Sequence, residues 1–433
     1  MSRAIRLYAI GGPEVLKLED VEVGQPGPGQ ARVRHSYVAV NFIDIYFRTG
    51  RYPMPLPNGL GSDAVGVVEA VGAGVSDIKV GDRVGYLLGP QGAYADVRIM
   101  PAEVLIPLPE GVSERSAATL MMKGMTAQYL FRQVFPLKGG ETILYHAAAG
   151  GVGLVACQWA RAIGVTMIGT VSTEAKAEVA RAHGCAHTIV TGGMSAEDMA
   201  REIPKRVKEI TGGQGVPVVY DSVGKDTLMA SLDSLRPRGS LVSNGTTSGP
   251  VQIDTTLLAV KGSIWLTRPA MIHYAMPRAH MLDMAQELFG HVLAGRITGE
   301  PRQQFALAEA ADAHRALESR RTEAEDFRSS GLVEANGLGH GVGHQVGLDS
   351  AARADIAAMY CSAAGHGPKP EAGLRWPTFP RSSSRLPQPC ASSATRSKRA
   401  SGSLRLAATM LGNGRRSRGT GSQPPACSAC RLG

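Results

Sequence analysis

Residues 144–154 read Leu144-Tyr-His-Ala-Ala-Ala-Gly-Gly-Val-Gly-Leu154, and this stretch decides the fold. It follows a short apolar run that begins at Thr142 and is typical of a buried strand. It leads into residues 152–163, whose pattern predicts a helix ended by Gly164. A glycine-rich turn between a strand and a helix is where the pyrophosphate of a dinucleotide binds, because the helix N-terminus offers it free amides. The stretch therefore predicts a dinucleotide-binding βαβ unit.

The glycine spacing in this turn is Ala148-x-Gly150-x-x-Gly153, so alanine replaces the first glycine of the GxGxxG pattern. Gly150 would let the backbone approach the pyrophosphate, and Gly153 would let the helix pack closely on the strand. The alternative interpretation is an ordinary glycine-rich turn between a strand and a helix. The βαβ context around the turn favours the dinucleotide site.

Strands and helices alternate from about residue 125 to 266, which predicts a doubly wound parallel sheet. The expected strands are Thr142–Ala147, Val165–Val171, Thr188–Val190, Val218–Asp221 and Ser240–Ser243. Residues 1–124 instead show short segments punctuated by Gly and Pro. Among them, Ala31–Val38 alternates with the period of a half-buried strand. The chain is thus predicted to combine a β-rich part with an α/β part.

The type of cofactor is read at the end of the second strand of such a fold, about 20 residues after the glycine turn. Ser172 and Thr173 stand there, with Lys176 one helical turn further on. Hydroxyl groups and a cation can hold a 2′-phosphate, so we expect NADPH rather than NADH. In the alternative, Glu174 binds the ribose of NADH and Lys176 is a solvated helix residue.

The positive charge of the chain is concentrated in its last quarter. Residues 323–433 carry 14 Lys and Arg against 7 Asp and Glu, which accounts for seven of the nine net positive charges. A nucleic-acid-binding function for the first 322 residues is therefore not indicated. Residues 323–433 have no sustained apolar period and are predicted to form a disordered basic tail, with at most non-specific attraction to nucleic acid.

The first 322 residues contain two well-separated cysteines, Cys157 and Cys185, which suits a reducing compartment. No apolar run reaches the length of a membrane span, and the first residues lack the apolar stretch of a signal peptide. We therefore expect a cytoplasmic protein without a membrane partner.

Three segments around the glycine turn together resemble a known signature: Gly140-Glu-Thr-Ile-Leu144, Ala148-Ala-Gly-Gly-Val-Gly153 and Gln158-Trp-Ala-Arg161. It is that of the zinc-free quinone oxidoreductases related to zeta-crystallin, within the medium-chain dehydrogenase/reductase superfamily. The resemblance extends from the N-terminus to about Thr322. It implies a GroES-like catalytic domain over residues 1–124 and 267–322, a Rossmann NADP-binding domain over residues 125–266, and a homodimer.

The resemblance also implies where ligands bind. Asn41, Tyr46, Tyr52 and Tyr129 would line the nicotinamide and quinone side of a cleft between the domains. The cofactor would be held, from pyrophosphate to 2′-phosphate and the adenosine and nicotinamide ends, by Gly150, Gly151, Val152, Gly153, Ser172, Lys176, Ser222, Gly245, Thr246, Thr267, Arg268 and Arg320.

The positions that bind catalytic zinc in related alcohol dehydrogenases carry other residues in this chain. Asn41 replaces the first cysteine, and Ser62-Asp63 replaces a His–Glu pair. Zinc prefers thiolate, imidazole or carboxylate ligands, so no metal site is expected. Hydride delivery to an electrophilic quinone needs no Lewis acid, because the cofactor carries the chemistry. Tyr46 or Tyr52 could give the reduced oxygen a hydrogen bond or a proton; equally, both could be apolar walls.

Two questions stay open at the level of sequence. The family closes with a glycine and a final apolar strand, whereas Glu323-Ala-Glu-Asp-Phe-Arg328 follows Thr322 here. We expect that strand to be missing and hypothesise that a reading-frame change or a lost stop codon replaced the native end. The expected function is an NADPH-dependent quinone reductase. The alternatives are an NADPH-dependent enone or enal reductase and a non-enzymatic, crystallin-like protein that binds NADPH or RNA.

Overall fold

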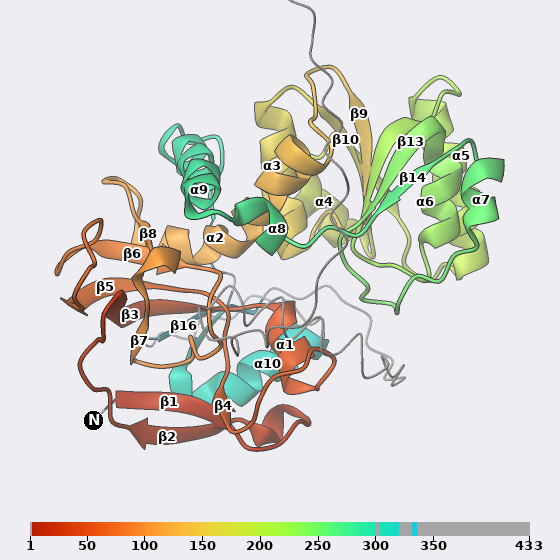
Figure 1. Ribbon diagram of the computed structural model, residues 1–433. Coiled ribbons are helices and arrows are strands. Elements are labelled where there is room, and N and C mark those ends of the chain that lie inside the picture. Colours follow the sequence, from red (N-terminus) through yellow and green to blue (C-terminus); the bar gives the residue numbers. More distant parts are fainter. Residues whose placement is uncertain (1, 300, 302, 320–330, 336–433) are drawn as a thin grey trace, which may run out of the picture. The chain divides into compact units, whose positions relative to one another are not determined.

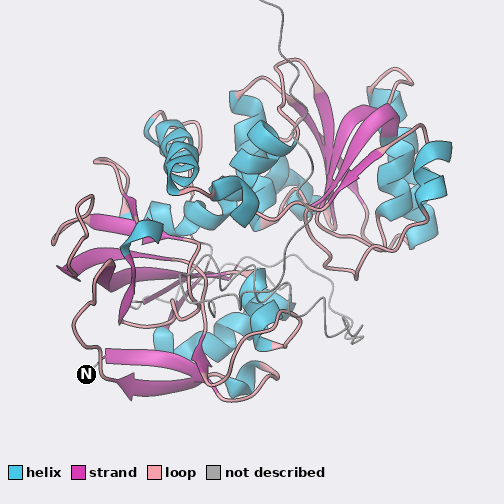
Figure 2. Ribbon diagram, in the orientation of Figure 1, coloured by secondary structure: helices cyan, strands magenta, loops and turns pink. Residues whose placement is uncertain are grey.

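The computed structural model describes residues 2–299, 301, 303–319 and the strand 331–335. Within them the chain forms a β-rich part and an α/β part (Figures 1 and 2). Apart from that strand, the predicted tail of residues 323–433 lies outside the described residues, as does Arg320. No helix in the described ranges is both long enough and apolar enough to cross a bilayer.

The β-rich part has the two-sheet arrangement expected of a GroES-like domain. One sheet has the order β2-β1-β4, and the other has the order β15-β16-β3-β5-β6-β8, with β7 also paired to β3. The strands are β1 (Ser2–Leu7), β2 (Lys17–Val21), β3 (Gln30–Val40), β4 (Asn58–Gly59), β5 (Ala64–Val71), β6 (Arg83–Tyr86), β7 (Val97–Pro101), β8 (Ile106–Pro107), β15 (Gln304–Ala306) and β16 (Gly331–Ala335). Two helices accompany them, α1 (Phe42–Arg48) and α10 (Ala310–Ser319).

Strand β3 follows the alternation expected for residues 31–38 as far as Arg34; a register shift between His35 and Tyr37 then interrupts it, and Val38 is buried. Ala31 and Val33 are fully buried, whereas Arg34 is exposed. From Val38 onward every residue of β3 is buried, because the strand runs on into the interior. It ends at Val40, and the next residue, Asn41, caps α1. This strand therefore places Asn41 and the first turn of α1 in the buried interior.

The α/β part is built on a parallel sheet with the order β11-β10-β9-β12-β13-β14, as predicted for a doubly wound fold. Its strands are β9 (Thr142–Tyr145), β10 (Thr166–Val171), β11 (His187–Val190), β12 (Val216–Asp221), β13 (Leu235–Ser243) and β14 (Trp265–Thr267). The helices that accompany this sheet are α3 (Gly151–Ala162), α4 (Glu174–Ala182), α5 (Ala196–Ile210), α6 (Leu228–Ser234) and α7 (Thr255–Val260). The other helices are α2 (Glu114–Tyr129), which contacts both α3 and strand β3, α8 (Ile272–Ala275) and α9 (Arg278–Leu293).

Helices cover both faces of this sheet, with α3 and α4 on one side and α5 and α6 on the other (Figure 1). Trp159 of α3 and Ala177 of α4 belong to one buried apolar cluster. Ile203 of α5 and Leu232 of α6 belong to another. A sheet packed on both faces holds its strand ends in place, and the glycine turn stands at the carboxyl end of β9.

The expectation that the final strand is missing is wrong. Gly331–Ala335 forms β16, which pairs in parallel with Tyr37–Val40 of β3 and antiparallel with β15. The segment Gly-Leu-Val-Glu-Ala has only two large apolar residues, so it shows no sustained pattern in the sequence. The strands on both sides supply its backbone hydrogen-bond partners, so a strand of five residues forms without a longer apolar pattern.

Candidate active site

The turn after β9 has the geometry predicted for a dinucleotide loop. Ala147 has a φ of 58°, and Gly150 is extended and caps α3 without a side chain to accept from the first-turn amides. A Cβ on Gly153 would lie 2.5 Å from the Ala147 carbonyl oxygen. The close packing that requires glycine at position 153 is thus present. The amides of Gly151, Val152 and Gly153 stay available to an anion.

The end of β10 brings a cation and a hydroxyl group together, as the sequence predicts. Lys176 Nζ donates to Ser172 Oγ at 3.1 Å. Glu174, the alternative ribose ligand, has its carboxylate 2.7 Å from Arg181 Nη2. The donor set at this strand end is therefore suited to an anionic group, and the nearest carboxylate is engaged along its own helix.

A cavity of about 490 Å³ lies beside the glycine turn. Residues from the β-rich part and from the α/β part both line it. Of the predicted site residues, the lining includes Asn41, Tyr46, Tyr52, Tyr129, Gly150, Gly151, Val152, Gly153, Ser222, Gly245 and Arg268. Ser172, Lys176, Thr246 and Thr267 lie outside this lining.

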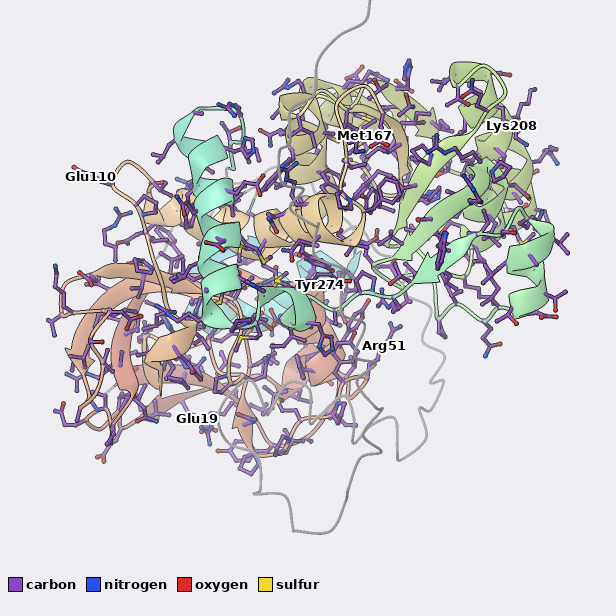
Figure 3. The ribbon with its side chains drawn as sticks, turned by 45° about the horizontal axis from the view of Figure 1, so that its top comes forward. Glu19, Arg51, Glu110, Met167, Lys208 and Tyr274 are labelled. Carbon is purple, nitrogen blue, oxygen red and sulfur yellow. The ribbon has the colours of Figure 1, made fainter. Side chains whose placement is uncertain are left out.

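Aromatic rings form one wall of the cavity. The rings of Tyr46 and Tyr52 meet edge to face with centroids 5.3 Å apart, and Tyr129 stacks on Tyr274 at 5.1 Å. The guanidinium of Arg51 lies 4.4 Å from the centre of the Tyr46 ring and donates to Thr246. Arg51 and Tyr274 are labelled in Figure 3. Burial raises the pKa of Tyr46, so its phenol is neutral at physiological pH.

The zinc positions of related dehydrogenases hold groups that are already bonded to one another. Asn41 Nδ2 donates to Asp63 Oδ1, and Ser62 Oγ donates to Asp44 Oδ1 at 2.6 Å. A donating amide and a donating hydroxyl do not match the ligand set of tetrahedral zinc. In the described part of the chain, no group of three or more His, Cys, Asp or Glu side chains is placed to hold a metal ion.

Several lining residues were not singled out by the sequence as site residues. Ser62 and Gln91 form a polar corner, in which Gln91 Nε2 donates to Ser62 Oγ at 3.2 Å. Lys123 of α2 is 5% exposed and also lines the cavity. The pair Ser62-Asp63, noted only as a replacement of zinc ligands, was the available signal for this corner. Lys123 carries no motif that separates it from a surface lysine.

The comparisons with known proteins agree with this architecture. The alcohol dehydrogenase GroES-like domain matches residues 27–110, and the zinc-binding dehydrogenase family matches residues 151–287. A quinone oxidoreductase of Pseudomonas aeruginosa is 52% identical over 324 residues, which are 74% of this chain and 98% of the relative. A 2-haloacrylate reductase of a Burkholderia species is 47% identical over 332 residues, 74% of this chain and 97% of its own.

The solved structure of Escherichia coli quinone oxidoreductase complexed with NADPH is 41% identical. It covers 77% of this chain and 100% of its own, with a TM-score of 0.71. Roughly a quarter of the chain thus has no counterpart in that structure, and nearly all of each relative has one here. By these matches and the two-part fold around the glycine turn, the chain belongs to the quinone oxidoreductase family of the medium-chain dehydrogenases and reductases.

Proposed function

We propose that this protein is an NADPH-dependent quinone reductase that binds both molecules in the cavity beside the glycine turn. The observation that carries the proposal is the meeting, in one cavity, of free helix amides at Gly151–Gly153 with a wall of tyrosine rings. Amides suit a pyrophosphate, and flat aromatic walls suit flat rings. When bound, NADPH supplies the hydride.

The chain's own residues hold and orient the two molecules. The amides of Gly151–Gly153 face the pyrophosphate, and Ser172 with Lys176 takes the 2′-phosphate, to which Arg320 is assigned by resemblance. The ends of the cofactor are bordered by Ser222, Gly245, Thr246, Thr267 and Arg268. Asn41, Tyr46, Tyr52 and Tyr129 enclose the nicotinamide and the quinone.

The test is NADPH oxidation by the purified full-length protein, with and without a simple para-quinone. NADH and a metal chelator are run beside it. We expect quinone-dependent oxidation that prefers NADPH and resists the chelator. No oxidation with any quinone, by protein that binds NADPH, would contradict the proposal. RNA retention that weakens with salt in a protein without turnover would instead favour the crystallin-like alternative.

A second candidate is reduction of an activated carbon–carbon double bond. It is favoured by the 47% identity with a 2-haloacrylate reductase. Competition between a para-quinone and an α,β-unsaturated ketone or a 2-haloacrylate separates the two, since the substrate with the higher kcat/KM identifies the activity.

We also propose a cytoplasmic homodimer. The support is the edge strand β14 of the parallel sheet, where Trp265 is 71% exposed, together with Val260 at 76% in the neighbouring helix. Large exposed apolar side chains at a sheet edge suit contact with a second copy. Light scattering of the purified protein measures the mass, and Trp265→Lys should reduce it to that of a monomer.

A further inference from the structure

A buried carboxylate lies directly behind the polar corner of the cavity. Asp44, on α1, is fully buried and accepts a hydrogen bond from Ser62 Oγ at 2.6 Å. Ser62 lines the cavity, so its hydroxyl stands between the carboxylate and any molecule bound there. The backbone amide of Asn41 donates to the second Asp44 oxygen at 2.9 Å.

A chain of hydrogen bonds continues from Asp44 through Tyr94 and His314 to the buried guanidinium of Arg48. The Tyr94 hydroxyl lies 3.0 Å from Asp44 Oδ2 and 3.1 Å from His314 Nε2. His314 Nδ1 lies 3.0 Å from Arg48 Nη1. Since a guanidinium can only donate, His314 must accept at Nδ1 and carry its proton on Nε2. His314 therefore donates to Tyr94, and Tyr94 donates to Asp44.

The Asn41 amide and the hydroxyls of Tyr94 and Ser62 all donate to Asp44. Of the two hydroxyl groups, that of Ser62 belongs to a residue that lines the cavity. Desolvation raises the pKa of Asp44 to about 6, although three hydrogen bonds to the carboxylate oppose the shift. The titratable, charged and hydroxyl groups around it come from three helices and two connecting segments: Arg48 on α1, Lys123 on α2, His314 on α10, Ser62 before β5 and Tyr94 before β7. A carboxyl group in this setting exchanges a proton near neutral pH.

We propose that Ser62 is the proton donor to the reduced quinone and that Asp44, acting through Ser62, replaces the proton. This inference rests on the proposed quinone reductase function. Two-electron reduction of a quinone takes one hydride, from the cofactor, and one proton. The hydride leaves a phenolate oxygen, the Ser62 O–H bond breaks as that oxygen takes the proton, and the Asp44 carboxyl proton passes to Ser62 Oγ. Asp44 regains a proton from water when product leaves.

Tyr46 lacks such a supply. The charged groups that act on its hydroxyl are the guanidinium groups of Arg51 and Arg268, and no described carboxyl group is among them. A Tyr46 phenol that gave up its proton could be reprotonated only by water. The Ser62–Asp44 pair, by contrast, holds donor and reservoir 2.6 Å apart.

The test uses the full-length protein and four variants. Ser62→Ala removes the donor, Ser62→Thr restores a hydroxyl, and Asp44→Asn removes the reservoir while keeping an acceptor for Asn41. Ser231→Ala is the matched control, because Ser231 Oγ donates to the buried Asp221 at 2.7 Å and does not line the cavity. The readouts are kcat with a para-quinone from about pH 5 to 9, the solvent deuterium isotope effect, NADPH affinity and melting temperature.

We expect wild-type kcat to fall as the pH rises above about 6, because the acid form of Asp44 is then lost. Ser62→Ala and Asp44→Asn should lower kcat about 100-fold and flatten this dependence, with unchanged NADPH affinity. Ser62→Thr should recover most of the rate. Ser231→Ala should keep the wild-type pH profile and isotope effect.

Folded Ser62→Ala with the wild-type kcat and pH profile would overturn the inference. Should that variant not fold, an unchanged pH profile in Asp44→Asn would overturn it equally. These results differ from a failure of the proposed function, in which the wild-type protein itself does not reduce quinones.

Discussion

Arg48 of α1 and Glu318 of α10 form an ion pair in which the arginine is 1% exposed and the glutamate 34%. The guanidinium also donates to the Gly11 carbonyl at 3.1 Å and to His314. Three acceptors therefore surround a buried cation. The pair ties the helix that carries Asp44 and Tyr46 to the last described helix of the chain.

Because the two partners differ in burial, their replacements should differ in cost. Arg48→Met leaves three acceptors without their donor and should lower the free energy of unfolding by about 3 kcal/mol. Glu318→Gln keeps an acceptor near water and should cost about 1 kcal/mol. Urea denaturation measures both. Equal losses would show that the arginine's burial does not set the cost.

His314 should make stability depend on pH. Desolvation, with a smaller effect of the Arg48 charge, lowers its folded-state pKa from 6.5 to about 3. Between those values the unfolded chain binds a proton at this histidine that the folded chain does not, so the contribution of His314 to stability falls as the pH drops below about 6.5. At about pH 5 the loss is about 2 kcal/mol. His314→Gln accepts from Arg48 and donates to Tyr94 without titrating, so it should lose less.

The measurement is the difference in unfolding free energy between about pH 7.5 and pH 5 in both proteins. His187→Gln, at an exposed histidine, is the control and should behave as wild type. An identical difference in the wild type and His314→Gln would count against a neutral buried His314.

Lys176 should decide between NADPH and NADH. Lys176→Glu places a carboxylate beside Ser172, where the 2′-phosphate is proposed to bind, and removes a charge-assisted hydrogen bond. KM for NADPH should rise at least about ten-fold, with little change for NADH. Steady-state kinetics with both cofactors gives the ratio. Lys205→Glu, an equal charge change on the exposed face of α5, should leave that ratio as it is.

Two glycine-to-alanine changes should have opposite signs. In Gly153→Ala the new Cβ would lie 2.5 and 2.6 Å from the carbonyl oxygens of Ala147 and Ala148, which cannot move without opening the turn. The expected loss is about 3 kcal/mol. In Gly290→Ala, inside α9, the Cβ meets nothing within 4 Å. Its helix propensity should add about 1 kcal/mol. Thermal denaturation that ranked the two alike would refute the packing argument.

Strand β16 should be needed for stability, and the residues after it should not. A chain that ends at Ala335 keeps the pairing with β3 and β15, whereas one that ends at residue 329 loses it. We expect the shorter chain to be about 2 kcal/mol less stable, since its β3 edge is left without a partner. Equal melting temperatures of the two chains would mean that the strand contributes nothing.

The glycine turn and its flanking elements are predictable because they depend on residues close in sequence. The alternation of strands and helices follows from local periodicity, and Gly153 follows from its spacing. The Asp44–Ser62–Tyr94–His314 chain is not predictable in this way. Its members lie up to 270 residues apart, and the sequence does not show whether an aspartate such as Asp44 is buried or exposed. They meet only in the folded domain, where α1, the segments before β5 and β7, and α10 come together.

Strand β16 was missed for a related reason. Its two apolar residues, Leu332 and Val333, stand among glycines and polar residues, so periodicity cannot separate them from the rest of the segment. The strand forms because β3 and β15 leave a ladder position between them. That position is a property of the sheet and not of the five residues.

The pairing of β16 with β3 also affects the order in which the two parts of the protein fold during synthesis on the ribosome. The parallel sheet from β9 to β14 is continuous in the chain and can close while later residues are still being made. The other sheet is complete only after residues 331–335 have been made, because β16 pairs with β3, which ends almost three hundred positions earlier. Throughout that interval the nascent chain exposes the edge of Tyr37–Val40, the segment that leads into the active site.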